Sequence, residues 1–183
     1  MKIMYLHGFA SFYKLSSDKV QALSQLAPVV GLDLDYSQGA QYVMDLACEF
    51  AKQEQVDLIV GCSLGGWLSA QAGSQLKLPF VLLNPSINPN QTLSRYIGKG
   101  ETFDGKPFVM TQEVIASYPD ITTTGNGLVL LQKDDEVLDA KESHEALKGH
   151  YETHLFEGGN HRFEGLEDHL GLIEAWFSKG LLD

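Results

Sequence analysis

The sequence contains little of what would place it in several large classes of protein. It has 2 cysteines in 183 residues, which is too few for a disulfide framework or a cysteine-based metal cluster. Cys48 and Cys62 are expected to be reduced, as in a cytoplasmic protein. No apolar run approaches the roughly 20 residues of a membrane span. The first residues lack a long apolar region and a small-residue cleavage site, so we expect no signal peptide.

Basic residues are also scarce. Lys and Arg number 13 against 24 Asp and Glu, which gives a formal net charge of -11. Such a charge disfavours nucleic acids and anionic membranes as partners. The sequence has no Cys-x-x-Cys pair, no Gly-x-Gly-x-x-Gly after its first predicted strand and no Gly-Lys-Ser/Thr phosphate loop. We therefore expect neither a metal nor a cofactor.

What is present is an alternation of short apolar runs with longer amphipathic stretches. Strands are predicted over residues 3–6, 29–34, 56–62, 79–83, 128–131 and 151–156. Helices are predicted over residues 15–27, 41–53, 64–75, 140–148 and 165–179. This order predicts an α/β fold with a mostly parallel sheet covered by helices on both faces. A chain of this length suits a single domain spanning residues 1–183.

One segment, residues 84–126, interrupts the alternation. It is punctuated by prolines and glycines, with a short helical possibility at 111–118. It also carries several apolar and aromatic side chains, a composition that disorder would disfavour. We interpret it as a lid-like insert whose Tyr96, Phe103 and Phe108 bind substrate. The alternative is a packed excursion without a catalytic role.

The strongest functional signal is Gly61-Cys62-Ser63-Leu64-Gly65, which follows a predicted buried strand and opens a predicted helix. Gly-x-Ser-x-Gly in that context is typical of a nucleophile elbow. The glycines permit a turn too tight for Cβ atoms. The turn would lift the Ser63 hydroxyl clear of the strand. The alternative is an ordinary strand-to-helix turn that happens to contain a serine.

A serine nucleophile needs a base, and the base needs a group that holds it. In this architecture the chain order is serine, acid, histidine. His161 follows the strand predicted at 151–156, so we assign it as the base. The acid follows the strand predicted at 128–131 and is Asp135 or Asp134. We favour Asp135, and we interpret Asp139 as the N-cap of the next helix.

An oxyanion hole requires backbone N–H donors. One is expected from Leu64, directly after the nucleophile. The other is expected from Phe9, in the loop after the first strand, where Gly8 allows the backbone to approach closely. His7 is interpreted as a buried residue that organises this loop.

Together these segments resemble the small bacterial YqiA-like esterases, compact members of the α/β-hydrolase superfamily. The resemblance rests on His7-Gly8-Phe9, on the Ser63 elbow, on Asp135-Glu136-Val137-Leu138 and on Gly158-Gly159-Asn160-His161. It implies a cofactor-free hydrolase with Ser63, Asp135 and His161 as its triad. Asp134 and Asn160 depart from the expected pattern. They stand where a glycine and an aspartate are expected.

The expected function is hydrolysis of small-molecule carboxylic esters through an acyl-enzyme. An alternative is a thioesterase for acyl-CoA-like substrates, whose phosphates would need basic residues such as Arg95, Lys99 and Lys106. A second alternative is a hydrolase-fold binding protein without turnover. The sequence does not indicate an oligomeric state.

Overall fold

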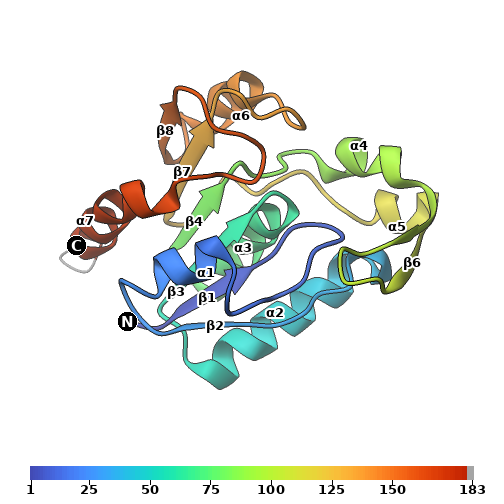
Figure 1. Ribbon diagram of the computed structural model, residues 1–183, viewed down its shortest axis with the longest axis horizontal. Helices are drawn as coiled ribbons and strands as arrows, with labels where there is room; N and C mark the ends of the chain where they lie inside the picture. Colours follow the sequence, from blue (N-terminus) through green and yellow to red (C-terminus); the bar gives the residue numbers. More distant parts are fainter. Residues whose placement is uncertain (181–183) are drawn as a thin grey trace.

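The computed structural model describes residues 1–180 and has a six-stranded parallel sheet at its centre (Figure 1). The strand order is β2-β1-β3-β4-β7-β8. The strands of this sheet are β1 (Ile3–Leu6), β2 (Val29–Gly31), β3 (Leu58–Cys62), β4 (Phe80–Leu83), β7 (Gly127–Gln132) and β8 (Glu152–Phe156). Every pairing in it is parallel, so the carboxyl ends of all six strands meet at one edge.

Helices cover both faces of the sheet, as the sequence predicts. The helices that follow the strands are α1 (Asp18–Leu23), α2 (Ala40–Glu54), α3 (Leu64–Leu76), α6 (Ala140–Leu147) and α7 (Leu170–Lys179). The four central strands, β1, β3, β4 and β7, are fully buried, whereas the edge strands β2 and β8 are only partly buried. The sheet divides the apolar side chains into two clusters. One cluster joins the sheet to α2 and α3, and the other joins it to α1 and α7.

The predicted elements agree with the observed ones to within a few residues in most places. The largest errors are at the first and last helices. The first helix is much shorter than predicted, and the last is divided into a 3-10 turn, η3 (Leu166–His169), followed by α7. Another 3-10 turn, η1 (Tyr36–Gln38), follows β2. Within residues 1–180 we find no helix with the length and apolar character that crossing a membrane requires.

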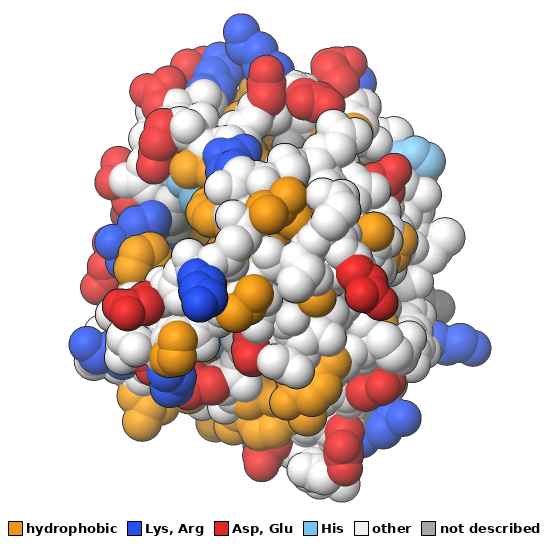
Figure 2. Space-filling view, turned by 90° about the vertical axis from the view of Figure 1, so that its right-hand side faces the viewer, with side chains coloured by type: hydrophobic (Ala, Val, Ile, Leu, Met, Phe, Trp, Pro, Cys, Tyr) orange, Lys and Arg blue, Asp and Glu red, His pale blue; other side chains and the backbone are white. Residues whose placement is uncertain are grey.

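The insert has more structure than the sequence indicates. It contains α4 (Pro89–Thr92), η2 (Leu93–Tyr96), an antiparallel hairpin of β5 (Gly98–Glu101) and β6 (Pro107–Met110), and α5 (Gln112–Ala116). The hairpin was missed because both strands have only four residues and β5 consists of glycine and charged residues alone. Figure 2 views the side on which Figure 1 places α4, α5 and β6. Apolar side chains there form scattered groups between charges of both signs.

Buried contacts fasten the insert to the rest of the fold. The Tyr118 hydroxyl donates to the Tyr36 carbonyl at 2.6 Å. The Trp67 indole N–H donates to the Pro119 carbonyl at 2.9 Å. The rings of Trp67 and Tyr118 meet edge to face, with centroids 5.1 Å apart. The C-terminal end of the insert is therefore packed against α3 and η1.

Candidate active site

Ser63 occupies a strained turn between β3 and α3. Its φ is 57° and its ψ is -121°, a conformation that non-glycine residues rarely adopt. The turn is this tight because two glycines let the backbones approach. A Cβ at Gly61 would collide with the Gly65 carbonyl, and one at Gly65 would collide with the Leu6 carbonyl. Strand and helix thus hold Ser63 at the carboxyl edge of the sheet.

The structure brings Ser63, His161 and Asp135 together in one hydrogen-bonded chain. His161 Nε2 lies 2.9 Å from Ser63 Oγ. On the other side of the ring, His161 Nδ1 lies 2.9 Å from Asp135 Oδ2 and 3.0 Å from Oδ1. A carboxylate can only accept, so Nδ1 carries the proton and Nε2 is free to accept from the serine hydroxyl.

Asp135 is held more firmly than Asp134. Its side chain is 1% exposed, against 17% for that of His161. Asp135 Oδ1 also accepts the backbone N–H groups of Val137 and Leu138, both at 2.8 Å. Asp134 is exposed. Asp139 is the N-cap of α6, as the sequence predicts.

The loop after β1 lies directly against the nucleophile. A Cβ built on Gly8 would stand 3.3 Å from Ser63 Cβ, so this loop passes close to Ser63 and leaves little room for a side chain there. Leu64 is the first residue of α3, where a helix leaves its N–H groups without intrahelical acceptors. The two predicted oxyanion donors, Phe9 and Leu64, therefore belong to segments that flank Ser63.

His7 is fully engaged in organising that loop. Its Nδ1 donates to the Gly8 carbonyl at 2.8 Å and its Nε2 accepts the Leu34 N–H at 2.9 Å. The Tyr36 hydroxyl donates to the His7 carbonyl at 2.6 Å. Burial lowers the pKa of His7 from its ordinary value of 6.5. The neutral ring is therefore the form that fits the fold.

This pKa predicts a pH-dependent stability. In the unfolded chain His7 binds a proton more readily, so the free energy of unfolding falls as pH drops below about 6.5 toward the lowered folded pKa. Urea denaturation of the native protein and of His7→Gln, above and below that pH, measures this contribution. We expect the native protein to lose more stability on acidification than the variant. Equal losses would contradict the assignment, because the carboxylates contribute alike in both proteins.

The predicted substrate-binding aromatics lie in different environments. Phe9 packs between two of them, with ring centroids 4.7 Å from Tyr96 and 5.0 Å from Phe108. Phe103 is 84% exposed. It lies in the hairpin turn, where side chains face solvent, and only its backbone reaches inward, with its N–H donating to the Ala10 carbonyl at 2.8 Å. This exposure does not fit the prediction that Phe103 lines a pocket.

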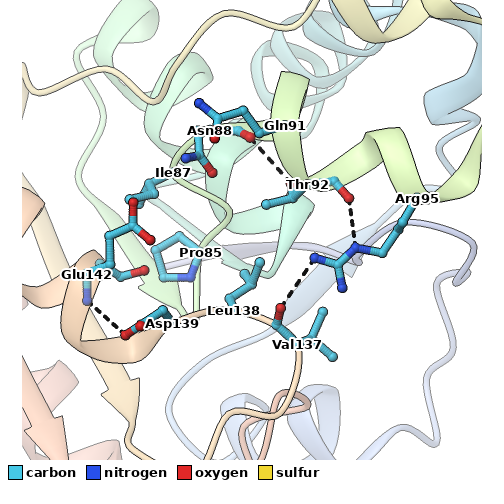
Figure 3. Close-up of a pocket in the computed structure, with 11 residues that line it drawn as sticks. Pro85, Ile87, Asn88, Gln91, Thr92, Arg95, Val137, Leu138, Asp139 and Glu142 are labelled. Carbon is cyan, nitrogen blue, oxygen red and sulfur yellow. Dashed lines mark hydrogen bonds between the residues drawn. The ribbon is translucent and has the colours of Figure 1, made fainter.

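A cavity of about 260 Å³ lies beside the acid loop, between the start of the insert and the N-terminal end of α6. Pro85, Val137 and Leu138 form its apolar walls (Figure 3). Arg95 stands on one side, donating to the Thr92 carbonyl at 3.0 Å and the Val137 carbonyl at 3.4 Å. The cavity therefore adjoins the backbone that holds Asp135.

A phosphate-bearing substrate would need basic side chains that are free to bind it, and one of the candidates already pairs with carboxylates. Lys106 pairs with Asp33 at 3.2 Å and with Asp104 at 2.8 Å.

Among residues 1–180 there is no group of three or more His, Cys, Asp or Glu side chains placed to hold a metal ion. His150 and His154 are four residues apart, but His154 lies in strand β8, so that spacing does not put them on one helix face.

Three residues that contact the His161 loop were given no role from the sequence. The Glu136 carboxylate accepts the His161 N–H at 2.9 Å, and this hydrogen bond lowers the pKa of Glu136. Asn84 and Gln132, both buried, bond to the backbone of the histidine loop. Their positions in the sequence could have indicated a role, because all three lie at or shortly after the carboxyl end of a buried strand. Folds with parallel sheets place their functional sites at these strand ends.

Comparison with known proteins identifies the family. Residues 2–178 match the family described as "Uncharacterised protein family (UPF0227)". The chain belongs to UPF0227. A UPF0227 protein of Shewanella sp. (strain MR-4) is 30% identical over 181 residues, covering 95% of this chain and 98% of that protein. The UPF0227 protein YcfP of Salmonella arizonae is 28% identical over 184 residues, covering 97% and 99%. The matches confirm the resemblance seen in the motifs.

Solved structures of more distant proteins share the fold of this UPF0227 chain. Est1E from Butyrivibrio proteoclasticus superposes with a TM-score of 0.67 at 16% identity, covering 98% of this chain and 86% of that one. Mouse alpha/beta hydrolase domain-containing protein 10 superposes with a TM-score of 0.71 at 14% identity, covering 100% and 90%. The predicted α/β-hydrolase fold is confirmed.

Proposed function

We propose that this UPF0227 protein is a serine hydrolase that cleaves carboxylic esters of small molecules. The observation that carries the proposal is the chain of hydrogen bonds from Ser63 Oγ through His161 to Asp135, with 2.9 Å at each step. Residues 1–183 would act as one catalytic domain, with residues 84–126 as its insert. The fold shared with Est1E and other hydrolases supports the same chemistry.

Each step of the reaction has a residue suited to it. Ser63 Oγ attacks the acyl carbon while His161 Nε2 takes the hydroxyl proton, and the backbone N–H groups of Phe9 and Leu64 stabilise the oxyanion. His161 then gives that proton to the alcohol as the C–O bond breaks. A water molecule, deprotonated by His161, then attacks the acyl carbon. His161 returns that proton to Ser63 Oγ as the bond between Oγ and the acyl carbon breaks, which releases the acid. Asp135 holds the ring in the required tautomer throughout.

A fluorophosphonate probe tests this proposal directly. The probe's phosphorus is attacked by an activated serine, and fluoride leaves. We expect stoichiometric labelling, located at Ser63 by peptide mass spectrometry, together with hydrolysis of p-nitrophenyl esters. A protein that hydrolyses no ester and leaves Ser63 unlabelled would instead be a hydrolase-fold binding protein.

We further propose that Phe108 and Tyr96 help to form the acyl-binding wall. Each methylene buried against such a wall contributes about 0.8 kcal/mol, roughly fourfold in kcat/KM. Phe108→Ala should therefore lose progressively more activity as the acyl chain of a p-nitrophenyl ester lengthens. Phe103→Ala is the matched control, because that ring is 84% exposed. A uniform loss at every chain length would mean that Phe108 only braces Phe9.

A further inference from the structure

We propose that Asn84 and Gln132 are positioning residues that clamp the histidine loop and so fix the distance between His161 and Ser63. The inference rests on the proposed function, in which His161 is the general base. Both side chains are buried and polar, at 2% and 5% exposure. Burying such groups is costly unless they are hydrogen-bonded, and the bonds that they make converge on residues 160–164.

Asn84 holds the loop from the end of β4. Its Nδ2 donates to the carbonyls of Asn160 and His161, at 2.8 and 3.3 Å. Its Oδ1 accepts the N–H of Gln132 at 2.9 Å, which ties it to β7. Asn84 adopts a φ of 42°, in the left-handed region that asparagine tolerates better than most residues.

Gln132 holds the same loop from the end of β7. Its Oε1 accepts the N–H groups of Asn160 and Glu164, both at 3.1 Å, and its Nε2 donates to the Glu164 carbonyl at 2.7 Å. The fit is close, because a Cβ on Gly159 would collide with the Gln132 side chain. Glycine before Asn160 is therefore required for the loop to rest on this amide.

The central sheet positions the clamp residues relative to the proposed triad. Ser63 follows β3, Asn84 follows β4 and Asp135 follows β7, and these three strands are neighbours. Cys62 pairs with Leu83, and Leu83 pairs with Leu130. The strand register therefore sets the place of the nucleophile, of the acid and of the two amides that hold the loop of the base. Alignment of reacting groups within 1 Å can be worth about 10²-fold in rate.

The test uses Asn84→Ala and Gln132→Met in the full chain, with Tyr151→Phe as the matched control. Like Asn84, Tyr151 is buried and donates to two backbone carbonyls, those of Thr122 and Thr124, but at the opposite end of β8 from His161. For p-nitrophenyl butyrate we expect both clamp variants to lower kcat by about 10²-fold with KM unchanged. The control should keep the native kcat.

A second readout separates positioning from mere stabilisation. The proton on His161 Nδ1, held by Asp135, gives a downfield proton NMR signal that needs no substrate. We expect both clamp variants to shift or broaden it, at urea concentrations where unfolding curves show each protein to be folded. Native kcat and an unshifted signal in folded clamp variants would overturn the clamp. Absence of fluorophosphonate labelling in the native protein would overturn the proposed function, while the NMR comparison would still decide the clamp.

Discussion

Ser63→Ala is expected to abolish ester hydrolysis, lowering kcat by about 10⁶-fold, as removal of the triad nucleophile does in subtilisin. The loss follows because the His161 imidazole and the predicted oxyanion donors have no attacking oxygen left to serve. The measurement is kcat on p-nitrophenyl butyrate at high enzyme concentration. Fluorophosphonate labelling should disappear in the same variant.

Ser69→Ala is the matched control for that substitution. Ser69 is a buried serine of α3 whose hydroxyl donates to the Gly65 carbonyl at 2.8 Å, within the helix. Its loss should leave turnover near the native level. If Ser63→Ala kept even about a tenth of the native kcat, far above the residual rate of a triad knockout, Ser63 would not be the nucleophile.

Asp135→Asn should lower kcat by about 10⁴-fold with little change in fold. Asparagine has nearly the same shape, and its Oδ1 can still accept the N–H groups of Val137 and Leu138. Its amide group, however, would donate to His161 Nδ1. That bond favours the tautomer with the proton on Nε2, which cannot accept the Ser63 proton.

Asp134→Asn provides the comparison at the neighbouring position. It removes the same charge from an exposed side chain, so its effect on kcat should be within a few fold. Steady-state kinetics of the two variants over a range of pH measures the contrast. A larger loss from Asp134→Asn than from Asp135→Asn would assign the acid to Asp134.

Much of the fold and of the candidate site could be predicted because the relevant signals are local. Buried strands and amphipathic helices have distinct periodicities, and the elbow places its glycines on either side of Ser63 at fixed spacing. His161 and Asp135 follow from their positions after strands. The sequence favours Asp135 over Asp134, and the structure adds the path of the backbone, which turns the Asp135 carboxylate toward His161 and leaves Asp134 exposed.

The clamp could not be predicted, because its contacts join residues that are distant in the sequence. Asn84 and Asn160 are 76 positions apart, and Asn84 and Gln132 are 48 apart. Asn84-Pro85 reads as an ordinary turn, and a glutamine at the end of a strand carries no motif. The exposure of Phe103 could not be predicted for a related reason, because its aromatic character is visible in the sequence whereas its place in a hairpin turn is not.

The anchoring of the insert also limits how this segment could be exchanged by engineering or could diverge among relatives. Leu93, Met110, Ile115, Tyr118 and Ile121 belong to the same buried cluster as side chains of β1, β3, α2 and α3. A chimera that received only a relative's insert would pair foreign side chains with native ones across that core. Overpacking and cavities of this kind typically cost about 1–5 kcal/mol each. Exchanges of this segment should therefore carry the facing residues of α2 and α3 with them.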